Sequence, residues 1–73
     1  MDKRILIKLG SRIREKRKSL GLSQELLAEK ANIDRSYMGG IERGERNITF
    51  LILCKICQAL GIDIASITKN LPE

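Results

Sequence analysis

Apolar residues recur every three or four positions along this chain, and glycine or asparagine interrupts them at short intervals. This spacing places apolar side chains along one face of an α-helix. In residues 2–20 the recurring positions are Ile5, Leu9, Ile13 and Leu20. Gly21 follows, and glycine is the residue type that most often ends a helix. The chain is therefore expected to consist of short amphipathic helices, beginning with one over residues 2–20.

Four further helices are predicted from residues that cap helix ends. Serine, aspartate and threonine favour the position before a helix, whereas glycine and asparagine favour the position after it. The expected caps are Ser23 and Asn32 for the second helix, Asp34 and Gly44 for the third, Thr49 and Gly61 for the fourth, and Asp63 or Ser66 before a short last helix that fades near Pro72. The apolar run ITFLILCKIC also fits a buried strand, but it extends to Leu60 and a helix stop follows, so a helix is favoured. The predicted fold is all-α with five helices.

Length and charge narrow the class of protein. A chain of 73 residues is too short for two hydrophobic cores, so residues 1–73 are predicted to form a single domain. Such a domain buries only about 60% of the surface of its unfolded chain, and dimerisation would add to its thin core. Lysine and arginine number 14 against 9 aspartates and glutamates, a net charge of +5. This balance favours a polyanionic partner, either nucleic acid or an acidic membrane surface.

Other classes of protein are disfavoured by what the sequence lacks. No apolar stretch reaches the roughly 18 residues of a membrane span, and no signal peptide is evident, so a cytoplasmic protein is expected. Cys54 and Cys57 form a CxxC motif without histidine or a second cysteine pair. Both are therefore predicted to be small buried hydrophobes rather than zinc ligands or redox groups. Without a catalytic constellation, we expect no enzymatic activity, cofactor, metal or small-molecule ligand.

The second and third predicted helices have the arrangement of a helix-turn-helix, because only three or four residues link them. In that motif the second helix lies in the major groove of DNA. A projection at about 100° per residue places the apolar side chains of the third helix on one face. The opposite face carries Arg35, Ser36, Gly39, Gly40 and Arg43. The third helix is therefore predicted to read DNA.

Gly39 and Gly40 are unusual inside a helix, because each glycine costs about 0.5–1 kcal/mol relative to alanine. Their place on the polar face suggests that they let the helix backbone approach base edges or the sugar-phosphate walls. The alternative is a turn that ends the third helix early. Ile41 continues the apolar spacing, however, and Gly44 provides a later stop. We predict that both glycines belong to the base-reading surface.

Individual DNA contacts follow from position and chemistry. Arg35 is best placed to read a guanine, whose O6 and N7 match a guanidinium, and Ser36 can hydrogen-bond a base or a phosphate. Ser23 and Gln24 begin the second helix, where free N–H groups and the helix dipole favour a phosphate. A further phosphate contact is predicted from Arg43, Arg46 and Asn47. The alternative for the charged residues is an ordinary solvated side chain.

The segment GLSQELLAEKANIDRSYMGGIERGERN strongly resembles the helix-turn-helix of the Cro/C1/Xre-type repressor family, and the resemblance continues through LCKICQALGID, over residues 9–64. It implies a lambda-repressor-like DNA-binding domain in which Gln24 contacts a phosphate. The matching base-reading positions are Arg35, Ser36 and Gly40. Arg17 and Glu42 match a structural ion pair that joins the first and third helices in such domains.

The stretch DRSYMGGIERGERNIT further resembles the small controller proteins of restriction–modification systems, which regulate transcription as dimers. The residues that this resemblance places against DNA are Arg35, Tyr37, Arg43 and Arg46. Tyr37 also borders the apolar arc, so a packed tyrosine is an equal alternative. A phage-type repressor or an antitoxin fits the same pattern. The chain departs from the family at Lys16, Asn32 and Ile48, where an apolar residue, a glycine and a proline are common.

Apolar residues of the fourth helix occupy more than one face. One arc of about 120° contains Phe50, Leu53, Ile56, Cys57 and Leu60. Leu51 and Ile52 project elsewhere, which suggests a second buried surface. A homodimer is therefore predicted, which would set two reading helices about 34 Å apart on a palindromic operator. The candidate interface residues are Leu51, Ile52, Ile64, Ile67 and Leu71. The alternative is that these residues only seal the core.

The sequence as a whole predicts a sequence-specific transcriptional regulator that binds double-stranded DNA as a homodimer. The rival class is a basic module that binds a protein or an acidic membrane through KRILIKLGSRIREKRK, whose basic residues crowd one helix.

Overall fold

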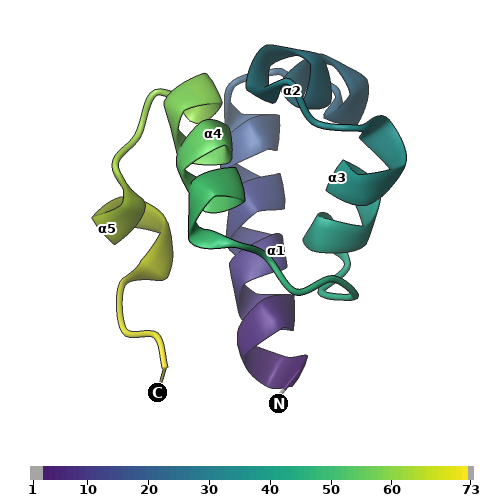
Figure 1. Cartoon of the computed structure of the whole chain (residues 1–73). Helices are drawn as coiled ribbons and strands as arrows, with labels where there is room; N and C mark the ends of the chain where they lie inside the picture. The colour runs from purple at the N-terminus through teal and green to yellow at the C-terminus, as the bar shows by residue number, and fades with distance from the viewer. Residues whose placement is uncertain (1–2, 73) are drawn as a thin grey trace.

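The computed structural model describes residues 3–72, and the regular structure in this range is entirely helical. The helices are α1 (Lys3–Ser19), α2 (Gln24–Ala31), α3 (Arg35–Glu42), α4 (Phe50–Leu60) and α5 (Ile64–Thr68). Figure 1 shows α3 and α5 on opposite sides of the molecule, with α1 and α4 between them. The all-α prediction with five helices is confirmed. The predicted first helical residue, at position 2, lies outside the described range.

Side-chain caps fix where the helices begin, as their residue types predict. The Oγ of Ser23 accepts a hydrogen bond from the backbone N–H of Leu26 at 3.0 Å. Caps of the same kind, each accepting from the N–H three residues on, are Asp34, Thr49 and Asp63. Asp63 rather than Ser66 is thus the cap of α5. Each cap satisfies one of the backbone N–H groups that have no partner inside the helix.

Left-handed backbone conformations close α2 and α4. Asn32 has a φ of 56° and closes α2, so asparagine here takes the left-handed conformation that glycine most often supplies at helix ends. Gly61, with a φ of 71°, closes α4. α3 ends at Glu42, and Gly44 lies beyond Arg43 in the following turn. The short α2–α3 link therefore depends on Asn32.

The core lies where the helices meet, and its innermost side chains come from four of them. These are Ile13, Leu27, Met38 and Ile56. Two apolar residues that the sequence pattern places on core faces are instead exposed: Leu20 by 46% and Phe50 by 72%. Leu20 follows the last residue of α1 and so leaves its register. Phe50 is the first residue of α4, whose burial begins one turn later at Leu53.

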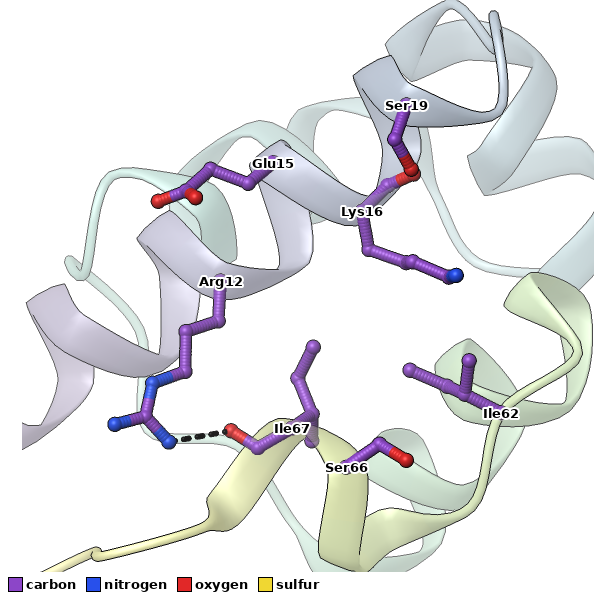
Figure 2. A pocket seen from close by; sticks show the side chains of 7 residues that line it. All are labelled: Arg12, Glu15, Lys16, Ser19, Ile62, Ser66 and Ile67. Atoms are coloured by element: carbon purple, nitrogen blue, oxygen red, sulfur yellow. Dashed lines mark hydrogen bonds between the residues drawn. The ribbon is translucent and has the colours of Figure 1, made fainter.

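The inner face of α5 is sealed against the core. Ile67 is only 3% exposed, so its predicted place in a dimer interface is wrong. The Arg12 guanidinium donates from α1 to the carbonyl oxygen of Ile67 at 3.1 Å, and also to that of Lys69. Figure 2 shows the contact between Arg12 and Ile67 at the edge of a groove between α1 and α5. Because these bonds satisfy carbonyls at the end of α5, they hold the short helix on α1.

The two cysteines are free thiols on α4. Cys57 is 2% exposed, and burial is the main reason that the pKa of its thiol is raised, so the neutral form is favoured. Cys54 is half-buried. Within residues 3–72 no three histidine, cysteine or acidic side chains come together as metal ligands. The predicted burial is thus confirmed for Cys57 and holds in part for Cys54.

A buried ion pair joins α1 to α3. The Nε of Arg17 lies 2.7 Å from the Oε2 of Glu42, and the Nη2 lies 2.9 Å from the Oε1, which makes the contact bidentate. Glu42 is only 2% exposed. Arg17 also donates to the carbonyl oxygen of Leu22, and Gln24 donates to the Oε1 of Glu42. One carboxylate therefore links α1, α2 and α3.

Replacing Glu42 with alanine is expected to destabilise the fold by about 3–5 kcal/mol, because Arg17 would remain as an uncompensated buried charge. Urea unfolding followed by circular dichroism measures the change. Glu29→Ala, at an exposed position of α2, is the control and should change stability by less than about 0.5 kcal/mol. The double variant Arg17→Met/Glu42→Leu should recover much of the loss. A loss below about 1 kcal/mol for Glu42→Ala would contradict this account.

Candidate nucleic-acid interface

The α2–α3 pair forms the helix-turn-helix that the sequence predicts. Three residues, Asn32, Ile33 and Asp34, separate the two helices. Ile33 is packed against the core, which fixes the turn, and Asp34 caps α3. Figure 1 shows α3 at the edge of the molecule, where α1 and α4 do not cover its outer side. α3 is thus placed as the recognition helix of this motif is placed.

The residues at the start of α3 are exposed. Arg35 has 68% of its side chain accessible, and Ser36 is exposed beside it. The Nη2 of Arg35 lies 3.3 Å from the Oε1 of Glu25, the second residue of α2. This ion pair is exposed, so water and salt screen it strongly. Arg35 remains accessible to a ligand that approaches the N-terminal end of α3.

Gln24 is held in place by the buried ion pair. Its Nε2 donates to the Oε1 of Glu42 at 3.1 Å, and its Oε1 is directed toward Gly39. An amide nitrogen carries two donors, so one N–H remains for another acceptor. Ser23 is exposed at the same helix end, but its oxygen is already the α2 cap. Of the two predicted phosphate contacts, Gln24 therefore keeps a free N–H, whereas the Ser23 oxygen is engaged as the helix cap.

The twin glycines do not form the uncovered surface that the sequence analysis expects. Both are buried, because long polar side chains fold over them. A Cβ on Gly39 would lie 3.1 Å from the Nη1 of Arg43 and 3.2 Å from the Oε1 of Gln24. A Cβ on Gly40 would lie 2.8 Å from the Cγ of Arg46. α3 continues through both residues, so an early turn is also excluded. The glycines make room for side chains of this protein, and their role in base readout stays a prediction.

Tyr37 is packed on its own chain. It is half-buried against the core, and its hydroxyl donates to the backbone carbonyl of Asn47 at 3.2 Å. The guanidinium of Arg46 lies over its ring, 5.7 Å from the centroid, at the distance of a cation–π contact. Gly40 lies beneath the same arginine. Tyr37 and Gly40 thus fix the position of Arg46 at the C-terminal side of α3.

Arg43 follows the last residue of α3 and is exposed. Its Nε lies 3.0 Å from the Oε1 of Glu45, in an ion pair whose side chains are 57% and 59% accessible. Asn47 is exposed as well, and its carbonyl is the acceptor for Tyr37. The three residues of the predicted second phosphate contact therefore lie together in the turn after α3, where each keeps polar groups open to solvent.

Two residues that position this surface are not evident from the sequence pattern. A Cβ on Gly10 would lie 2.6 Å from the carbonyl oxygen of Glu42, so α1 crosses the end of α3 backbone to backbone. The cost of a glycine in the middle of a helix is the signal that points to it. The second residue is Glu25. Its charge is already accounted for by its place in the first turn of a helix, and sequence spacing does not indicate its contact with Arg35.

Comparison with known proteins assigns the family. A helix-turn-helix family model matches residues 13–67, three quarters of the chain or slightly more. The chain therefore belongs to the Cro/C1-type helix-turn-helix family. Its relatives include control proteins of restriction–modification systems, as the narrower resemblance predicts.

Three relatives illustrate the match. The control protein C.MunI of a Mycoplasma species is 35% identical over 70 residues, which cover 94% of this chain and 95% of C.MunI. The restriction-modification controller protein C.AhdI from Aeromonas hydrophila is 50% identical, with a TM-score of 0.79 over 80% of this chain and 88% of C.AhdI. The controller protein C.Esp1396I, solved as a tetramer in complex with its natural 35 base-pair operator, is 38% identical, with a TM-score of 0.81 over 86% of this chain and 83% of its own.

Replacing Gly40 with alanine is expected to separate stability from DNA binding. Alanine favours a helix by about 0.5–1 kcal/mol, but its Cβ would lie 2.8 Å from the Cγ of Arg46, so this side chain must turn away and lose its contact with the Tyr37 ring. The net change in stability should therefore be small. Affinity for duplex DNA should fall because Arg46 is displaced, and the salt slope of binding should decrease in magnitude by about one for each bound protomer. Fluorescence anisotropy at several salt concentrations measures both.

Gly10→Ala is the matched control for this substitution. Its Cβ would meet backbone carbonyls that cannot turn away, so about 1–3 kcal/mol of stability should be lost. Equal stability changes in the two variants, or unchanged DNA binding by Gly40→Ala, would contradict the prediction that Gly40 makes room for Arg46 at a DNA-contacting position.

Proposed function

We propose that this protein is a sequence-specific transcriptional regulator of the controller type, which binds a palindromic operator as a homodimer. The observation that supports this most directly is the exposure of Arg35 and Ser36 at the start of α3, the second helix of the helix-turn-helix. Base edges in the major groove are reached from this position of the motif. The net charge of +5 favours approach to a duplex.

The surface divides into base-reading and backbone-contacting parts. Arg35 is proposed to donate to O6 and N7 of a guanine, and Ser36 to a base or an adjoining phosphate. Gln24 and the free N–H groups at the start of α2 are proposed to bind one phosphate stretch. A second stretch is proposed for Arg43, Arg46 and Asn47 beyond α3. Phosphate contacts at both ends would set the register of α3 in the groove.

The proposed dimer uses the apolar residues that the single chain leaves open. At the start of α4, Leu51 is 65% exposed and Phe50 is 72% exposed. Ile52, Ile64 and Leu71 are half-buried along α4 and beyond. Exposed apolar side chains gathered on adjoining helices are typical of an interface. Pairing through them would give the two-fold symmetry that a palindromic operator requires.

Arg35→Ala tests the proposed reading role. Binding to a palindromic duplex, selected from random DNA by the unmodified protein, should weaken by about 1–3 kcal/mol per half-site, because each protomer loses one bidentate base contact. Affinity for a shuffled duplex should change much less. Lys30→Ala is the control, since Lys30 faces a groove beside α4. Equal weakening on both duplexes would contradict base readout by Arg35.

Leu51→Glu tests the dimer. A charge on this apolar surface should favour the monomer, which analytical ultracentrifugation detects, while the helical circular dichroism spectrum is retained. Operator affinity should fall because one recognition helix alone remains. Gln58→Glu makes the same charge change at an exposed position of α4 and should leave the dimer intact. A monomeric starting protein, or an unaltered dimer in Leu51→Glu, would refute this interface.

The alternatives are separable. A phage-type repressor or an antitoxin has the same fold, and the neighbouring genes distinguish them.

The rival interaction module is less favoured, because Arg12 and Arg17 of the basic segment are used inside the fold. Within residues 3–72, no helix has the length and apolar character to cross a membrane. Helix-turn-helix regulators are also typically not enzymes. Liposomes that compete better than duplex DNA would favour the rival.

A further inference from the structure

A glutamate lies among the residues that are proposed to contact DNA. Glu25 is the second residue of α2, and its Oε1 lies 3.3 Å from the Nη2 of Arg35. Both side chains are about two-thirds accessible, so the pair lies on the open surface. A carboxylate at this place repels a polyanion and thereby opposes the attraction that the other residues provide. Its presence in the interface requires an explanation.

Helix stability explains only part of it. A negative charge in the first turn of α2 interacts favourably with the helix dipole. That interaction requires a charge at the helix end, but it does not require contact with the neighbouring helix. In the structure the carboxylate instead reaches across the helix-turn-helix to the guanidinium at the start of α3. The contact ties Glu25 to Arg35 rather than to α2 alone.

Building on the proposed function, we propose that Glu25 is a specificity-determining residue that keeps Arg35 from binding phosphates indiscriminately. On a duplex without the correct base, Arg35 would have to leave Glu25 to reach a phosphate, so the ion pair withholds that non-specific contact. On the operator, one N–H of Nη2 can stay on Glu25 while its second N–H and Nη1 make the bidentate match to guanine O6 and N7. The ion pair is then kept in the specific complex and lost only in a non-specific one. Glu25 therefore lowers non-specific affinity more than specific affinity.

Glu25→Gln is the direct test, because it removes the charge and keeps the size of the side chain. Affinity should be measured for the selected palindromic duplex and for a shuffled duplex, by fluorescence anisotropy at several salt concentrations. The variant should bind the shuffled duplex about two- to fivefold more tightly, as expected for release of a surface ion pair. The salt slope for this duplex should steepen by about one for each bound protomer. The ratio of specific to non-specific affinity should fall.

Two controls separate pairing from charge. Glu29→Gln makes the same charge change at an exposed position one turn along α2 and should preserve the ratio. Glu25→Asp keeps the charge at the helix end but shortens its reach, so its ratio should move toward that of Glu25→Gln. In an Arg35→Ala background, Glu25→Gln should no longer lower the ratio, because the partner is gone.

The outcomes distinguish this inference from the proposed function. If the unmodified protein prefers one palindrome and Glu25→Gln changes both affinities by the same factor as Glu29→Gln, the role of Glu25 is refuted and the regulator stands. If Glu25→Asp matches the unmodified protein, charge alone acts and the role of pairing is refuted. If the unmodified protein binds all duplexes equally, the proposed function itself fails.

Discussion

The buried carboxylate of Glu42 is the interaction on which the DNA-facing side of this protein depends. It accepts from Arg17 on α1 and from Gln24 on α2, while it belongs to α3 itself. A charge at this depth is tolerated only when its hydrogen-bonding capacity is satisfied. Among the described residues, no buried side-chain nitrogen or oxygen is left without a partner. The relative placement of three helices is therefore tied to one fully bonded group, and Gln24 connects that group directly to the surface.

The polar side of α3 is organised by the chain itself before any ligand is present. Gln24 and Arg43 fold over Gly39, and Arg46 lies between Gly40 and the ring of Tyr37. The glycines are thus a requirement of intramolecular packing, and side chains with DNA-binding chemistry rest on them. Side chains that already occupy defined positions lose less conformational entropy when they bind than freely moving ones. The helix-turn-helix is accordingly a prearranged surface rather than a bare helix.

Much of this fold follows from local sequence signals. The caps Ser23, Asp34 and Thr49 have the predicted role, because capping depends on residues three positions apart that the sequence places together. The errors arise where distant elements decide. Helical projection gives the direction of Phe50 and Ile67 around an axis, but not whether another helix covers them, so the first is exposed and the second buried. The covering of the glycines and the contact of Glu25 with Arg35 are equally non-local. The DNA-contacting roles themselves rest on chemistry and family resemblance.

The backbone crossing at Gly10 has a consequence for how such proteins diverge. Because α1 contacts the end of α3 through main-chain atoms, the position of α3 does not depend on the side chains of its outer face. Positions 35 and 36 can be exchanged without repacking the interior. If Arg35 and Ser36 read bases as proposed, single substitutions at these positions would change the DNA sequence preference and leave the fold intact. The fold and the DNA sequence preference can therefore change independently of each other.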